Sequence, residues 1–249
     1  MKKSLLLLIS LISFMRMDLS AQVMDKEYMD LFDLYMMDDY EKCLKKAMKY
    51  TENDKSKKDA QPWFYVTMCY YKISMNSELE EKYPGALMES FKAAKRFRKF
   101  DVSGKVWNEN QDFFDEYKAY VLKKFTPEVK NGSYKEAAKH FKKFQEVDES
   151  DYGIQIIAGI TYILANKMEG VSWVESAIDS LKSKYTGAKF KAESLDKEAL
   201  LQSAFVEYSA FLAQKDDQKE LAMKVIEAGR DIMVDNDEVQ RQYARMNRK

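Results

Sequence analysis

The chain has 249 residues, of which 46% are apolar and 33% are charged, so it can fold around a substantial core. Its 8 glycines and 3 prolines are too few for the many turns of a β-sandwich or barrel. The basic and acidic residues balance at 41 each, without the basic excess that a generic nucleic-acid-binding protein needs.

The N-terminal segment has the pattern of an export signal. Two lysines precede an apolar run at residues 4–15, and small residues allow cleavage after Ala21. A membrane-spanning anchor, the alternative, needs roughly 20 apolar residues, and no cysteine lies near the cut to carry a lipid. Removing residues 1–21 takes away three bases and one acid and leaves 38 bases and 40 acids. We therefore expect an exported, periplasmic domain at 22–249 with no stable membrane span, at most peripheral to the outer membrane.

Amphipathic helical spacing recurs along the rest of the chain, which predicts an all-α fold. A Thr126-Pro127 step is expected to kink or restart one long helix. Polar linkers lie at 51–61 and 186–193, and the second is a candidate point of subdivision. The expected helices are 25–37, 40–50, 62–75, 85–100, 106–125, 127–131, 133–147, 152–166, 168–185, 194–214, 217–234 and 237–246.

Several helix starts share the pattern Tyr-x-x-small. The pairs are Tyr40 with Cys43, Tyr83 with Ala86, and Tyr134 with Ala137, and Ala222 marks a weaker fourth copy. The tyrosines are 43 and 51 residues apart, against 34 in the standard repeat, and the linkers account for the excess. Antiparallel helix pairs joined by such turns stack into a solenoid, because each pair buries its apolar face on its neighbours.

With the segment "PWFYVTMCYYK" at Pro62 and the Gly159 and Tyr162 positions of "IQIIAGITYIL", these turns resemble the tetratricopeptide repeat family. The resemblance implies stacked antiparallel helical hairpins, a TPR-like α-solenoid. It also implies that the first helices of successive repeats line a groove for a protein partner. The alternative is that the same side chains belong to the core. The implied groove residues are Tyr28, Phe32, Tyr35, Met36, Phe64, Met68, Tyr71 and Lys72.

Candidates for chemistry are few. The only histidine, His140, follows Ala137 by three residues and is expected on the helix surface. The run starting at Asp148 faintly resembles a calcium loop, but Gly159 stands where the twelfth position needs an acid. No zinc-ligand spacing and no glycine-rich phosphate loop is present in the sequence. We therefore predict no catalytic residue, no metal and no cofactor, with an enzyme on a helical scaffold as a weaker hypothesis.

The stretch Asn131-Gly132-Ser133 matches a glycan acceptor pattern, but it is also typical of a helix stop. Ser133 and Glu136 have the spacing of a capping box that would start the next helix. Cys43 and Cys69 are expected to be buried free thiols, and a disulfide between them is the alternative.

Charge is concentrated in two regions. Residues 25–41 carry seven acids against one base, and residues 92–99 carry five bases. A solvated helix face is the default interpretation of such a basic patch, and a contact for an acidic partner or for lipid head groups is the alternative. The basic residues are Lys92, Lys95, Arg96, Arg98 and Lys99.

Together these features predict an exported, non-enzymatic adaptor or scaffold of the bacterial cell envelope that binds protein partners in assembly or secretion. The alternative is a helical periplasmic protein that binds a peptide or a glycan.

Overall fold

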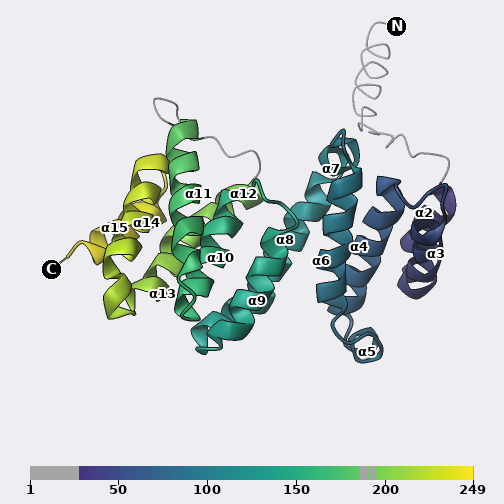
Figure 1. The fold of residues 1–249 in the computed structure, drawn as a ribbon, viewed down its shortest axis with the longest axis horizontal. Coiled ribbons are helices and arrows are strands. Elements are labelled where there is room, and N and C mark those ends of the chain that lie inside the picture. Colours follow the sequence, from purple (N-terminus) through teal and green to yellow (C-terminus); the bar gives the residue numbers. More distant parts are fainter. Residues whose placement is uncertain (1–27, 186–189, 191–194, 249) are drawn as a thin grey trace, which may run out of the picture.

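The computed structural model describes residues 28–185, 190 and 195–248, and every regular element among them is a helix (Figure 1). The all-α prediction is therefore confirmed. The predicted export signal at 1–21 and nearly all of the linker at 186–193 lie outside the described residues. The α-helices are α2 Met29–Met36, α3 Tyr40–Glu52, α4 Ala60–Met75, α5 Ser77–Lys82, α6 Ala86–Phe100, α7 Lys105–Glu109, α8 Gln111–Lys130, α9 Tyr134–Gln145, α10 Tyr152–Leu164, α11 Glu169–Tyr185, α12 Leu195–Ser203, α13 Ser209–Ala213, α14 Lys219–Ile232 and α15 Asp237–Met246. A π-helical turn, Ala204–Tyr208, joins α12 to α13.

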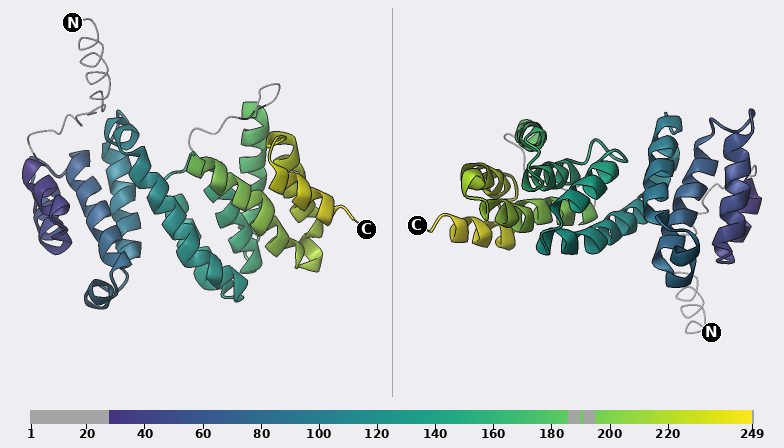
Figure 2. Two further views of the ribbon diagram at one scale, coloured as in Figure 1. Left: turned by 180° about the vertical axis from the view of Figure 1, so that it is seen from behind. Right: turned by 60° about the horizontal axis from the view of Figure 1, so that its bottom comes forward.

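The helices stand side by side in chain order, so α2 and α15 lie at opposite ends of an elongated molecule (Figures 1 and 2). Each helix packs mainly on those next along the chain: α3 on α4, α4 on α6, α9 on α10, and α10 on α11. Other contacts join helices that are not consecutive, among them α6 with α9, α8 with α12, α10 with α12, and α11 with α14. One continuous hydrophobic core runs through the row from Tyr28 to Val239.

The long helix departs from the prediction. It breaks at Asn110, between α7 and α8, and then runs without a restart through Pro127 to Lys130. Proline removes one helical hydrogen bond, but buried residues before and after Pro127 in the sequence hold the helix against its neighbours. Phe125 and Val129 are buried, and the Thr126 hydroxyl hydrogen-bonds the Tyr208 hydroxyl at 3.1 Å.

The turn at residues 131–133 ends α8 as predicted. Gly132 takes the left-handed conformation with φ +80°, and the Ser133 amide donates to the Glu128 carbonyl at 2.8 Å. The predicted capping box is wrong, since the Ser133 side chain makes no capping hydrogen bond. Its ψ of 54° lies outside the extended region from which a cap hydroxyl normally reaches the first turn.

Helices α10 and α11 cross at two glycines. A Cβ on Gly159 would lie 2.7 Å from the Val174 methyl and 2.8 Å from the Gly170 carbonyl oxygen. A Cβ on Gly170 would lie 2.3 Å from the Gly159 carbonyl oxygen. Only hydrogen at both positions lets the two backbones approach this closely, in keeping with the small position that the sequence pattern assigns to Gly159.

Candidate functional site

The groove residues inferred for the first helices do not form an open surface. Tyr28, Phe64, Met68 and Tyr71 are all buried, and Tyr71 has no exposed surface. The groove assignment is therefore wrong for these four residues, and the core alternative holds. The physical reason is that α4 packs against both α3 and α6, so its apolar side chains are covered on opposite sides.

The other four residues have mixed surroundings. Phe32, Tyr35 and Lys72 are half-buried, whereas Met36 is 64% exposed. Burial raises the pKa of the Tyr35 hydroxyl well above its usual range. The Lys72 ammonium is paired with the Glu116 carboxylate at 3.1 Å. These side chains are thus engaged within the fold, and Met36 alone projects freely.

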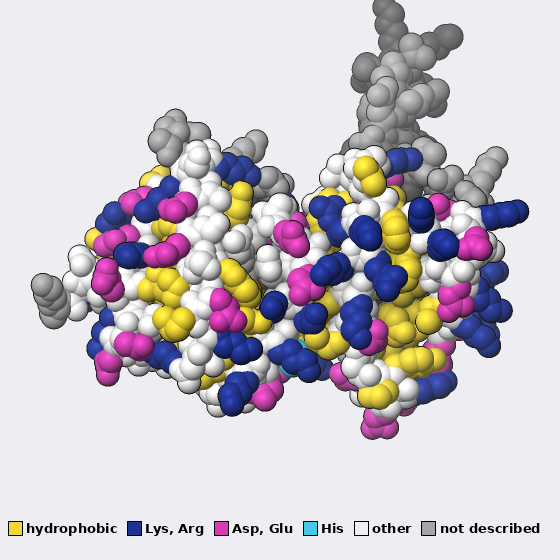
Figure 3. All heavy atoms as spheres, viewed as in Figure 1, with side chains coloured by type: hydrophobic (Ala, Val, Ile, Leu, Met, Phe, Trp, Pro, Cys, Tyr) yellow, Lys and Arg dark blue, Asp and Glu magenta, His cyan; other side chains and the backbone are white. Residues whose placement is uncertain are grey.

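The predicted basic patch does border a hollow. Its side chains cover one face of α6, where Lys and Arg gather in Figure 3. Opposite them stand the end of α9 and the loop to α10, and the hollow between the two walls measures about 900 Å³. We call this hollow the basic groove. Its lining residues are Phe91, Lys92, Lys95, Arg96, Arg98, Lys99, Lys143, Glu146, Val147, Asp148, Glu149 and Ser150.

Half of the groove cations have carboxylate partners. Lys92 pairs with Glu89 at 2.6 Å on its own helix. Glu146 lies between two lysines, with its carboxylate oxygens 2.8 Å from the Lys95 ammonium and 3.6 Å from the Lys143 ammonium. Burial would raise the pKa of Glu146, but the hydrogen bond from Lys95 and the charge of Lys143 outweigh it and hold that pKa below its usual value.

The remaining three cations of the groove have no carboxylate partner among the described residues, and two of them lie on tryptophan rings. The Arg96 guanidinium lies 5.0 Å from the Trp63 ring centre, and the Arg98 guanidinium lies 4.0 Å from the Trp107 ring centre. A guanidinium stacked on an indole keeps its position while its N–H edge stays available to an oxyanion. Lys99 is exposed and has no ion-pair partner in the described part of the chain.

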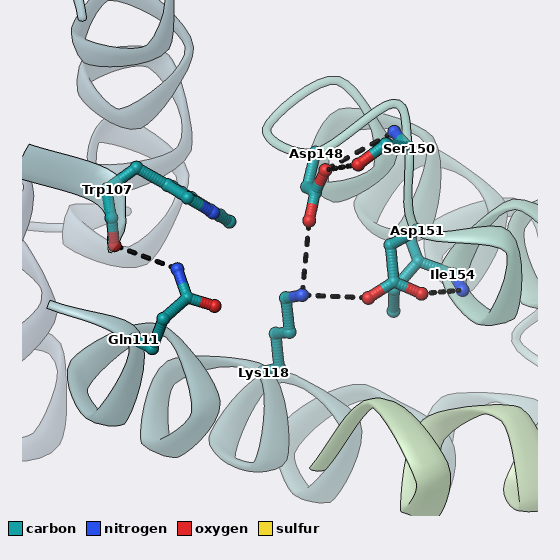
Figure 4. Close-up of polar contacts among 7 residues, drawn as sticks. All are labelled: Trp107, Gln111, Lys118, Asp148, Ser150, Asp151 and Ile154. Carbon is teal, nitrogen blue, oxygen red and sulfur yellow. Dashed lines mark hydrogen bonds and ion pairs between the residues drawn. The ribbon is translucent and has the colours of Figure 1, made fainter. Parts of the chain in front are cut away.

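Beneath the groove lies a buried ionic junction (Figure 4). Lys118 of α8 extends its ammonium to Asp148 at 3.2 Å and to Asp151 at 2.8 Å. The three side chains are between 3% and 6% exposed. Trp107 connects the junction to the groove, since the Lys118 ammonium lies 5.8 Å from the same ring that carries Arg98.

The two aspartates also organise the loop that forms the second wall. Asp148 accepts hydrogen bonds from the amide and hydroxyl of Ser150, and Asp151 caps α10 by accepting from the Ile154 amide at 3.2 Å. Burial would raise the pKa of Asp148, but the charge of Lys118 and the Ser150 hydrogen bond outweigh it and lower that pKa. The two aspartates of the run that faintly resembled a calcium loop thus pair with Lys118.

His140 is not the solvated surface residue that the sequence predicted. Its ring stacks on Phe125 with centroids 4.2 Å apart, and its Nδ1 hydrogen-bonds the Glu128 carboxylate at 2.9 Å. The position faces α8 because α9 folds back along it after the Gly132 turn. His140 therefore holds α9 against α8 through its contacts with Phe125 and Glu128.

Cys43 and Cys69 are free thiols with no exposed surface. The Cys43 thiol donates to the Leu31 carbonyl at 3.4 Å. Its hydrogen bond to Cys69 and the burial of Cys69 raise the pKa of the Cys69 thiol far above its usual range. The Cys69 thiol therefore stays protonated, and both cysteines pack as small core residues between α3 and α4.

Sequence reasoning missed the second wall of the groove and the junction. The five bases of α6 form a visible run, but residues 143–150 lie more than 40 positions later and only the fold brings them opposite. One signal was present for Lys118. It stands four residues after Phe114 and three before Val121, on the apolar stripe of its helix, where a charge needs a partner.

Comparisons with known protein families, with curated proteins and with solved structures give no match to this chain. Within the described residues, no helix has the length and apolar character needed to cross a membrane. Within the same residues, no three His, Cys, Asp or Glu side chains are grouped so as to hold a metal ion.

Proposed function

We propose that the protein is a non-enzymatic, TPR-like binding scaffold that holds an acidic segment of a partner protein in the basic groove. The observation that carries the proposal is the hollow itself. Arg96, Arg98 and Lys99 line it without a carboxylate partner in the described part of the chain, and two of them are fixed on tryptophan rings. Fixed, unneutralised cations lose little entropy when an anionic partner binds.

The site differs from the groove expected from the family resemblance. It lies against α6 and α9, the second helices of their expected pairs, and not against the first helices α2 and α4. The first helices supply core, so a partner has less surface to contact there. Consecutive helices pack in chain order, and this packing supports the stacked architecture that the resemblance implies.

The export pattern at the N-terminus supports a role in the bacterial cell envelope, with partners in assembly or secretion. The alternative of a glycan as ligand is less well supported than a protein partner. Sugar binding would use open aromatic platforms, and most of the aromatic residues of the groove expected from the family resemblance are in the core.

Cross-linking in intact cells, followed by mass spectrometry, tests the proposal. The wild type is compared with a groove variant that removes three cations, Lys92→Ala, Arg96→Ala and Lys99→Ala. A matched control removes three exposed lysines of α8 and α9 outside the groove, Lys123→Ala, Lys130→Ala and Lys135→Ala.

We expect a specific protein partner with the wild type and the control, and its loss with the groove variant. Each surface cation contributes roughly 0.5–1 kcal/mol, so losing three weakens binding by about 10- to 100-fold. Equal recovery by all three proteins, or no reproducible partner, would contradict the proposal. Thermal melting of each variant checks that it folds.

A further inference from the structure

We infer that the occupant of the basic groove is an acidic α-helix laid along α6, an inference that rests on the function proposed above. Lys92, Lys95 or Arg96, and Lys99 stand at positions i, i+3 or i+4, and i+7 of one helix. Residues at this spacing share a face. We call these side chains the cationic stripe; at 1.5 Å per residue, it is about 10 Å long.

Spacing favours a helix over an extended peptide. A helix with acids at i, i+4 and i+7 presents three carboxylates on one face along the same 10 Å or so. An extended strand repeats on one face only about every 6.6 Å, so it places about two carboxylates over that length. A helical partner can therefore place one carboxylate opposite each of the three cation positions on α6.

The protein already contains one contact of this kind. Glu146, directly after α9, reaches across the groove and bonds the Lys95 ammonium of α6 at 2.8 Å. A carboxylate carried by a neighbouring helix end thus reaches the cationic stripe with good geometry. Because the same carboxylate also neutralises Lys143, Glu146 competes with any incoming acid for these two cations.

Charge and shape favour a peptide over a membrane. The lining carries six cations against three carboxylates, and one of those carboxylates, Asp148, is already bound by Lys118. Five of the cations lie on α6 and one, Lys143, lies on α9, so they line both walls of a hollow, whereas a flat membrane surface would meet the rim of that hollow. A narrow rod with acids on one side fits between the walls.

Fluorescence anisotropy at low salt with two labelled, side-chain-stapled helical peptides tests this inference. Both peptides are alanine-rich and carry three glutamates, one at i, i+4 and i+7, the other at i, i+2 and i+5, which spreads them over two faces. Vesicles with anionic lipid form a third probe. The proteins are the wild type, the groove variant and the control variant defined above, and Glu146→Gln.

The wild type should bind the matched peptide about 10-fold more tightly than the mismatched one. The affinity of the groove variant for the matched peptide should fall about 10-fold, and that of the control variant should stay unchanged. Glu146→Gln, which frees Lys95 and Lys143, should bind the matched peptide about threefold more tightly. Equal binding of both peptides, or binding of vesicles alone, overturns the helical occupant.

The proposed function fails by a different result. If no peptide binds but the cellular partner is still lost with the groove variant, only the helical occupant is refuted. If the cellular partner is unaffected by the groove variant, the function itself is refuted.

Discussion

The ionic junction beneath the groove allows a strong prediction about stability. Replacing Lys118 with methionine keeps most of the side-chain volume but removes the ammonium that both Asp148 and Asp151 contact. The two carboxylates would then remain buried beside each other without the ammonium that both contact, and among the described residues only the charge of Lys197 is seen to act on Asp148 besides it. Breaking a buried ion pair in this way costs about 3–5 kcal/mol, because the charge left behind is uncompensated.

The expected effect on the melting temperature follows from the size of the protein. For chains of this length, about 1 kcal/mol lowers the melting temperature by roughly 2–4 °C, so Lys118→Met should lower it by roughly 6–20 °C. Differential scanning calorimetry and urea denaturation measure the change. A loss below about 1 kcal/mol would show that the junction is more hydrated than its burial implies, and would refute the reasoning.

A compensated variant separates charge from packing. Combining Lys118→Met with Asp148→Asn and Asp151→Asn removes all three charges. Asparagine keeps an oxygen for the Ser150 hydroxyl and for the Ile154 amide, which the two aspartates serve now. We expect this triple variant to recover most of the lost stability. Failure to recover would mean that lost packing, and not buried charge, explains the single substitution.

Three further predictions follow from the fold. Lys118 lowers the folded-state pKa of Asp148, so the stability that this ion pair contributes is present above pH ~4 and is lost as the pH falls. The wild type should therefore lose more stability between about pH 5 and 2 than the charge-free triple variant. Equal losses would contradict this. Gly159→Ala should destabilise the protein by about 1–3 kcal/mol, because the added Cβ would clash with Val174 and Gly170. Gly132→Ala should cost about 1 kcal/mol, because its Cβ would meet no atom and only the positive φ is unfavourable. The reverse order in urea denaturation would refute the crossing geometry. The two cysteines should resist a thiol reagent in the folded protein and react at once in denaturant; fast reaction of the folded chain would show that they are not buried.

The helices were largely predictable from local chemistry. Helix α15 has the bounds expected from the sequence, and Asn236 caps it by accepting from two backbone amides. Pro127 misled the prediction because its cost is local, whereas the packing of Phe125 and Val129 that holds the helix together comes from distant parts of the chain. Local signals predict where a helix can end, and tertiary contacts decide whether it does.

The site was predictable in part. The basic face of α6 is visible as a run of charge, but the facing wall depends on how α9 returns to α6. The error over Phe64, Met68 and Tyr71 has a signal in the sequence. Helix α4 is apolar around most of its circumference, which is typical of a helix covered on several sides and not of a groove wall.

The central claim is that a protein partner lies in the basic groove, and site-specific photocross-linking tests it most directly. A photoreactive amino acid is placed at position 99, in the groove, or at position 135, outside it, and the protein is irradiated in intact cells. We predict a discrete cross-linked partner from position 99 and none from position 135. The same partner from position 135 alone, or no protein cross-link from position 99, would contradict the account.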